Sequence, residues 1–133
     1  MMMKRNVLVL TILILVLTSV SFGCKRTVPI QDYGNSGLTA NSKLTANQVR
    51  DAIVRAGTSI GWKMNAASPG LVTASWMTRS HSVTVDIPYT ANEYTIKYRE
   101  STNLNAKNGE IHSNYNRWVD RLNRNIAAEI RKK

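Results

Sequence analysis

The one cysteine of this chain, Cys24, has the setting that most clearly indicates a chemical reaction. A basic start, Lys4 and Arg5, precedes an apolar run from Val7 to Val20. This layout is typical of a secretory signal peptide. A lone thiol directly after such a segment is the usual attachment site of a bacterial lipid anchor. The sequence therefore predicts a signal peptide over residues 1–23 and a lipid on Cys24.

Two processing routes are compatible with this site. Bacterial lipoprotein signals usually carry Leu three residues before the cysteine and a small residue two before it, where this chain has Ser21 and Phe22. Ser21 and Gly23 also fit the small-x-small rule of ordinary signal peptidase, which would release a soluble exported protein with a free thiol on Cys24. Lipidation is preferred because cysteine occurs nowhere else in the chain.

The same segment predicts where the protein resides. The apolar run spans 14 residues, whereas a helix needs about 20 to cross a bilayer core. No later segment approaches that length, so we expect no membrane-spanning helix in the mature chain. Lys25 follows the cysteine in place of the aspartate that retains lipoproteins in the inner membrane. In a Gram-negative host this favours the outer membrane, with the protein facing the periplasm.

Four arginines of the predicted C-terminal helix recur at helical spacing: Arg117, Arg121, Arg124 and Arg131. They lie almost opposite the apolar stripe of the same helix. Guanidinium groups bind phosphates through two parallel hydrogen bonds, so this stripe could bind an anionic lipid or glycan. The alternative is a solvated outer face, on which Asp120 pairs with Arg124 at i+4.

The two histidines, His81 and His112, do not form part of a recognisable catalytic or metal-binding pattern. A metal site needs three or four converging ligands, and neither histidine has Cys, His or carboxylate neighbours at ligand spacing. The chain also lacks a nucleophile elbow, a phosphate-binding glycine loop and a metalloprotease helix motif. We therefore predict no catalytic residue, no metal and no cofactor.

Charge narrows the class of partner. The chain has 18 Lys and Arg against 8 Asp and Glu. Two of these cations precede position 24, so the remaining 110 residues carry 16 against 8 and have the length of one domain. Such a balance would indicate nucleic acid in the cytoplasm, but export excludes that partner. The expected anionic partners are phospholipid headgroups, lipopolysaccharide phosphates or acidic glycans. Alternatively, the basic surface only aids solubility.

The expected domain begins after a polar segment. Residues 24–43 are rich in Ser, Asn, Thr and Gly and read as the lipidated cysteine with a flexible tether. Thr45 and Gln48 then form a capping box, which starts a helix over about residues 46–56. Gly57 is a natural helix stop.

Four segments with strand character follow, and the apolar residues alternate in the last three of them. They span residues 60–64, 71–78, 82–87 and 94–99, before a second amphipathic helix over 114–131. Short connections between alternating strands predict an antiparallel meander. The sequence therefore predicts a two-layer α+β domain over residues 44–133. Its order is α-β-β-β-β-α, with both helices on one face of the sheet.

The opposite face of the predicted sheet is polar and would be uncovered. Such a face could bind a glycan or a partner protein, although most polar sheet faces are simply solvated. Its expected residues are Thr73, Ser75, Met77, Thr84, Asp86, Thr95, Lys97 and Arg99.

Several ordered motifs resemble those of a group of small uncharacterised bacterial lipoproteins. The motifs are Gly61-Trp62-Lys63-Met64, Pro69-Gly70, the Val-x-Val-x-Ile-Pro-Tyr stretch ending at Tyr89, Tyr94-x-Ile-x-Tyr98, Ser101-x-Asn103-Leu104 and Ile111-His112-x-Asn114-Tyr115-Asn116-x-Trp118. The resemblance covers essentially the whole mature domain. It implies an envelope lipoprotein with one α+β domain of about 90 residues, and it supplies no activity and no catalytic residue.

Together these features predict a lipid-anchored, non-enzymatic protein of the bacterial cell envelope. It would act through binding, including an envelope protein partner, or through structural support. The alternative is a module that recognises anionic lipid or glycan through its basic helix face, and a hydrolase ranks third.

Overall fold

The computed structural model describes residues 26–38 and 43–133. Cys24 and the expected signal peptide lie outside the described residues. In chain order the elements are β1 (Thr27–Pro29), β2 (Tyr33–Asn35), α2 (Ala46–Ser59), β3 (Lys63–Ser68), β4 (Leu71–Met77), β5 (Ser82–Pro88), β6 (Tyr94–Thr102), β7 (Glu110–His112) and α3 (Asn114–Arg131). No helix among these elements is long and apolar enough to span a membrane.

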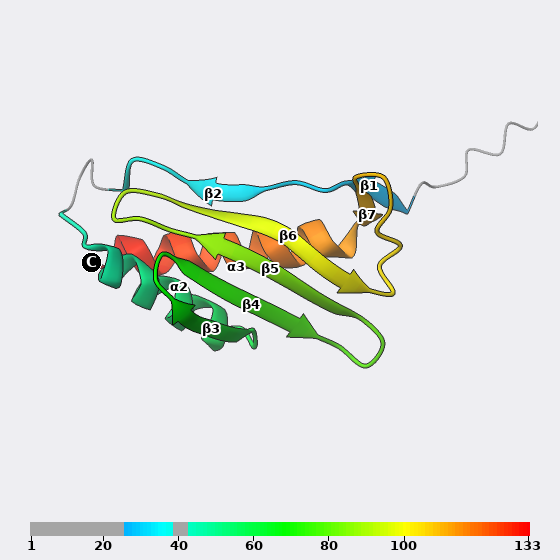
Figure 1. Cartoon of the computed structure of the whole chain (residues 1–133), viewed down its shortest axis with the longest axis horizontal. Helices are drawn as coiled ribbons and strands as arrows, with labels where there is room; N and C mark the ends of the chain where they lie inside the picture. The colour runs from blue at the N-terminus through cyan, green and yellow to red at the C-terminus, as the bar shows by residue number, and fades with distance from the viewer. Residues whose placement is uncertain (1–25, 39–42) are drawn as a thin grey trace, which may run out of the picture.

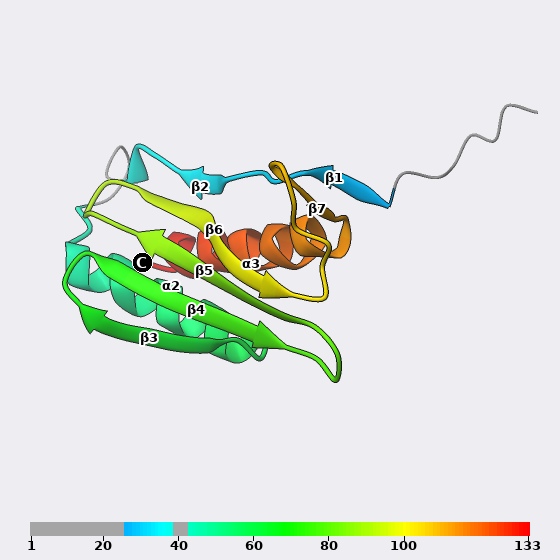
Figure 2. The ribbon, with the colours of Figure 1, turned by 45° about the vertical axis from the view of Figure 1, so that its right-hand side comes forward.

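The fold is α+β, as predicted, and has two layers. One antiparallel sheet has the strand order β2-β6-β5-β4-β3, and β1 pairs with β7 in a separate two-stranded sheet. Both helices lie on the same face of the larger sheet (Figures 1 and 2). The expected α-β-β-β-β-α order is present as α2 to α3. Three further strands, β1, β2 and β7, were not predicted.

The core follows the two periodicities of the sequence. Alternate residues of the central strands are fully buried, among them Val72, Val85 and Ile96. The apolar stripe of α3 covers them and is buried at Tyr115, Val119, Leu122, Ile126 and Ile130. Trp118 lies at the margin of this stripe and is only half-buried, and its ring centroid lies 6.4 Å from that of His81.

The start of α2 is as predicted, but its end is not. Thr45 Oγ1 accepts from the Gln48 amide at 3.2 Å, and the Thr45 amide donates to Gln48 Oε1 at 2.9 Å. The helix continues through Gly57 to Ser59. Gly57 is buried, and any Cβ there would collide with the sulfur of Met64, so this glycine permits close packing of β3 against the helix. The left-handed residue that ends the helix region is Gly61, with φ +91°.

This longer helix displaces the first strand. Residues 60–62 form the turn after α2, and Trp62 is buried in the core. The strand β3 therefore begins at Lys63, three residues after the expected start at residue 60.

The expectation of a flexible tether up to residue 43 is wrong for residues 26–38, which we call the strap. Its β1 pairs with β7, and its β2 forms an edge of the larger sheet against β6. Two further backbone hydrogen bonds hold the strap. Between β1 and β2, the Ile30 amide donates to Gly109 O at 2.8 Å; after β2, the Leu38 amide donates to Asn92 O at 2.9 Å. Ile30 and Leu38 also pack against the core. The strap is thus part of the domain.

The side chain of Asn116, on α3, forms two hydrogen bonds with the backbone of the strap. Asn116 Nδ2 donates to the carbonyl oxygen of Pro29 at 2.9 Å, and the Gln31 amide donates to Asn116 Oδ1 at 3.4 Å. The amide group of Asn116 thereby replaces a strand partner between β1 and β2.

We predict that Asn116→Ala loosens the strap without unfolding the domain. The two lost hydrogen bonds are each worth about 0.5–1.5 kcal/mol, and the strap contributes little of the core. Hydrogen exchange of the amides of residues 27–35 should accelerate, whereas the amides of β5 should keep their protection. Asn125→Ala is the matched control, because among the described residues the Asn125 side chain bonds only Arg121 O on its own helix. Unchanged exchange of the strap amides would contradict the inference that the two Asn116 hydrogen bonds hold the strap in place.

Candidate functional site

The four arginines predicted to bind anions lie on the outer side of α3. The apolar stripe faces the sheet, so Arg117, Arg121, Arg124 and Arg131 all have exposed side chains. We call these four residues the arginine ridge. The helical rise of 1.5 Å per residue makes the ridge about 21 Å long from Arg117 to Arg131.

Only one member of the arginine ridge is paired with a carboxylate in the described part of the chain. Arg124 Nη2 lies 3.0 Å from Asp120 Oδ2, as the i,i+4 spacing predicted. An exposed pair of this kind contributes about 0–1 kcal/mol and can exchange its partner for a phosphate. Arg117, Arg121 and Arg131 make no ion pair with a described carboxylate, so their guanidinium groups are free to bind anions.

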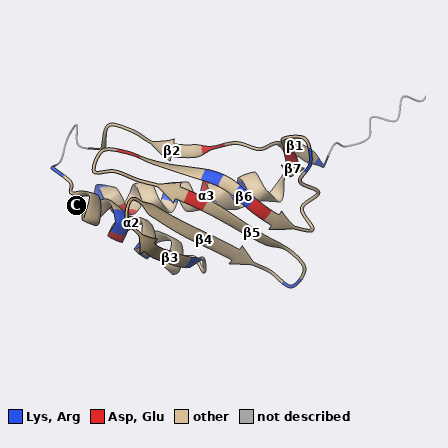
Figure 3. Ribbon diagram, viewed as in Figure 1, with Lys and Arg blue, Asp and Glu red and all other residues tan. Residues whose placement is uncertain are grey.

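Positive charge is not confined to this ridge. Figure 3 shows Lys and Arg on α2, on β6, near β1 and in the turn between β4 and β5. Near the C-terminus, a hydrogen bond from Lys132 Nζ at 2.6 Å holds the pKa of the Glu129 carboxyl below its usual value, with a smaller effect from Arg55. The molecule is therefore basic on several sides.

The uncovered face of the sheet carries the polar side chains that the alternation predicted. Asp86 accepts from Thr73 Oγ1 at 3.2 Å and pairs with Arg99 Nη1 at 3.4 Å. Ser75 and Thr84 oxygens lie 3.4 Å apart across β4 and β5. These groups largely bond one another along the sheet, as expected of a solvated face. Met77, with 77% of its surface exposed, is the large apolar side chain that interrupts it.

The two histidines lie in separate hydrogen-bonded settings. His81 Nδ1 lies 3.0 Å from the Asn103 carbonyl oxygen, and His112 Nδ1 accepts from the Asn114 amide at 3.2 Å. Among the described residues, neither histidine forms a hydrogen bond or ion pair with a serine hydroxyl or a carboxylate. Across residues 26–38 and 43–133, no group of three or more His, Cys, Asp or Glu side chains is arranged to hold a metal ion.

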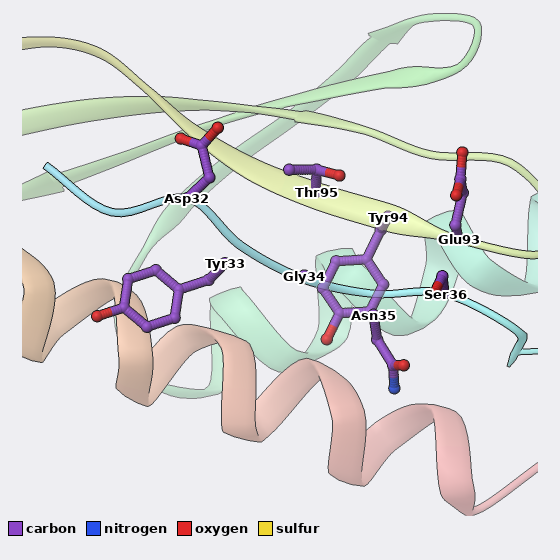
Figure 4. Close-up of a pocket in the computed structure, with 8 residues that line it drawn as sticks. All are labelled: Asp32, Tyr33, Gly34, Asn35, Ser36, Glu93, Tyr94 and Thr95. Atoms are coloured by element: carbon purple, nitrogen blue, oxygen red, sulfur yellow. The ribbon is translucent and has the colours of Figure 1, made fainter.

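The strap creates a hollow that the sequence did not predict. It has a volume of about 290 Å³ and lies beside β2 and β6. Figure 4 shows Tyr33, Asn35 and Tyr94 pointing toward α3, whereas Asp32 and Glu93 point to the other side of β2. Gly34 lets β2 approach β6 closely, because any Cβ there would collide with the backbone carbonyl oxygen of Tyr94. The two carboxylates are at opposite ends of the hollow and do not converge on one point.

Two tyrosines are buried in the core near this hollow: Tyr94 lines it from β6, and Tyr115 belongs to α3. Burial raises the pKa of Tyr94 to about 12, against a small opposing effect of Arg131, and its hydroxyl donates to Asn123 Oδ1 at 2.7 Å. Burial, assisted by the carboxylate of Asp32, also raises the pKa of Tyr115. The Tyr115 hydroxyl has no hydrogen-bond partner among the described residues. Both phenols stay protonated, and neither is suited to act as a base.

Comparisons with protein-family models, with curated proteins and with solved structures find no match. The resemblance to small bacterial lipoproteins therefore stays a prediction.

We predict that the two tyrosines make the fold sensitive to alkali. Their pKa values are raised in the fold, so the unfolded chain loses these protons first, near the usual pKa of about 10. The free energy of unfolding should be insensitive to these groups below about pH 9 and fall as pH rises from about 10 through 12. Denaturant unfolding at pH 8 and pH 11 measures this decline.

Two Tyr→Phe variants separate the contributions. Tyr94→Phe should cost about 1 kcal/mol at pH 8, because it removes a hydrogen bond. Tyr115→Phe should be neutral or stabilising at pH 8, because the lost hydroxyl has no partner, and it should also flatten the alkaline decline. A large loss of stability at pH 8 in Tyr115→Phe would contradict this assignment.

Proposed function

We propose that this protein is a lipid-anchored component of the bacterial cell envelope that acts through binding or structural support and not through catalysis. The observation that carries the proposal is the position of the lone Cys24. It follows a segment with the layout of a signal peptide, and the strand β1 begins at Thr27, three positions later. A domain attached in this way needs no membrane-spanning helix of its own.

The surface chemistry supports a binding or structural role. The exposed functional groups are mainly guanidinium, ammonium, hydroxyl and amide groups, spread over α3, the strap and the open sheet face. General acid–base or nucleophilic catalysis requires a base within hydrogen-bond reach of the group it activates. His81 and His112 instead contact backbone atoms.

We predict that the protein exported from a bacterial host carries a diacylglyceryl or triacyl group on Cys24. Mass spectrometry of the N-terminal peptide measures this directly. Cys24→Ser should move the protein from the membrane fraction to the soluble periplasmic fraction, or leave it unprocessed. Unmodified Cys24 on the mature protein would reject the anchor and make a disulfide-linked dimer the next form to test.

The alternative is a module that binds anionic lipid or glycan through the arginine ridge. The specific support is that three of the four guanidinium groups make no ion pair with a described carboxylate. Phosphate-driven binding through such groups weakens steeply as salt screens the charges.

This alternative predicts a large effect of ridge charge on binding that does not depend on the anchor. In the Cys24→Ser background, changing Arg117, Arg121 and Arg124 to Gln should abolish binding to phosphatidylglycerol vesicles at low salt. The matched control changes Lys63, Lys97 and Arg99 to Gln, which removes three charges from the open sheet face and should leave binding nearly unchanged. Equal effects of the two triple variants would reject the ridge as a binding surface.

A further inference from the structure

The strap fixes one end of the domain close to the expected lipid. The Ser113 amide donates to Arg26 O at 3.1 Å, and Thr27 Oγ1 donates to Glu110 Oε2 at 3.2 Å. Thr27 is therefore held against β7 and the start of α3. Thr27 is three positions after Cys24, and an extended chain of that length spans at most about 11 Å. The end of the domain around Thr27, which we call the anchor end, is thus confined near any lipid on Cys24.

Segments distant in sequence meet at the anchor end. The loop of residues 103–109 leads into β7, and Asn103 ties it to the β4–β5 turn: Asn103 Nδ2 donates to Ser80 O at 2.6 Å, and its carbonyl lies 3.0 Å from His81 Nδ1. Figures 1 and 2 show the β4–β5 turn, this loop, β1 and the first turn of α3 at the same end of the long axis.

Four exposed cations come from these segments: Arg26, Arg79, Lys107 and Arg117. None forms an ion pair with a described carboxylate. Glu110 is the carboxylate in β7 at this end, and it accepts the hydrogen bond from Thr27. Glu100 lies nearby on β6, where it is paired with Thr84 across the sheet.

The side of the molecule along the strap is less suited to an anionic surface. Asp32 and Glu93 line its hollow, and Asp120 lies beside the arginine ridge, where it pairs with Arg124 at 3.0 Å. If the domain lay along the ridge, Asp120 would also approach the lipid phosphates.

We propose that the anchor end sits on the anionic headgroups of the membrane that holds the lipid, with α3 directed away from the bilayer. The proposal rests on the lipid anchor of the proposed function and competes with the arginine ridge as the lipid-facing surface. Arg26, Arg79, Lys107 and Arg117 contact lipid phosphates. Arg131 lies about 21 Å farther along α3, beyond two Debye lengths of about 8 Å at physiological salt.

Lysine footprinting of the mature lipidated protein tests this orientation. The protein is reconstituted in phosphatidylglycerol vesicles and, separately, in phosphatidylcholine vesicles, and an amine-reactive reagent labels its lysines at 0.15 M salt. Lys107 should react at least fivefold more slowly in the anionic vesicles, because phosphate contacts shield it. Lys133, at the far end of α3, should change less than twofold.

Single charge changes provide matched variants. Arg79→Gln removes an exposed cation in the β4–β5 turn, at the same end of the domain as Lys107, and it should restore at least half of the Lys107 reactivity. Arg131→Gln removes one exposed cation at the distal end of α3 and should leave the Lys107 footprint unchanged. Neither residue makes an ion pair in the described chain, so both variants should keep the fold.

The outcomes separate the orientation from the anchor. Protection of Lys133 equal to or greater than that of Lys107 would overturn the proposal in favour of the arginine ridge, and the absence of protection at both would overturn it outright. The mass of the N-terminal peptide tests the anchor independently. If Cys24 proves unmodified, its thiol, the only one in the chain, is coupled to a maleimide lipid and the same footprint decides the orientation.

Discussion

Val72, Val85 and Ile96 lie on adjacent strands with no exposed surface, and the two helices form one continuous core with them. Each such side chain stabilises the fold by about 1.5–3 kcal/mol on burial. Only one face of the sheet is apolar, so both helices must lie on that face and the other face stays in water. The close approach of α2 at Gly57 and the long apolar stripe of α3 follow from this one requirement. Because the apolar stripe of α3 faces the sheet, the arginine ridge on the opposite side of the helix faces the solvent.

The strap makes the two ends of the domain different, because only one end carries the chain that leads to Cys24. Its two short strands pair with β6 and β7, and Asn116 bridges the gap between them. Because the strap is fastened from its first residues, the point of attachment to Cys24 is tied to one end of the long axis. A free tether of about 20 residues would reach roughly 25 Å and impose no orientation. The fastened strap instead leaves two residues, Lys25 and Arg26, between Cys24 and the start of β1.

The position of each cation relative to Cys24 decides which partner it can reach. A basic surface on several sides does not by itself select a partner, since exposed charges contribute little to stability and are screened by salt. Under the proposed attachment through Cys24, lipid phosphates would be concentrated around the cations at one end of the domain and not around the others. The same arginines and lysines can then differ in function although they are equally exposed.

The sequence by itself determined the elements whose pattern is local. Alternation marked β4, β5 and β6, the capping box marked the start of α2, and the 3.6-residue period marked both the core stripe of α3 and the four arginines opposite it. These features depend on neighbours within a few positions, so their periodicity is visible in the sequence.

Tertiary structure alone decided the strap, the hollow beside it and the end of α2. The strands β1 and β2 have three residues each, too few to show a period, and their partners lie about 60 to 85 positions away in the chain. Gly57 resembled a helix stop, but in the fold its missing side chain leaves room for Met64 of β3 to pack against the helix. Pairing and close packing of distant segments depend on the assembled fold, and no local composition encodes them.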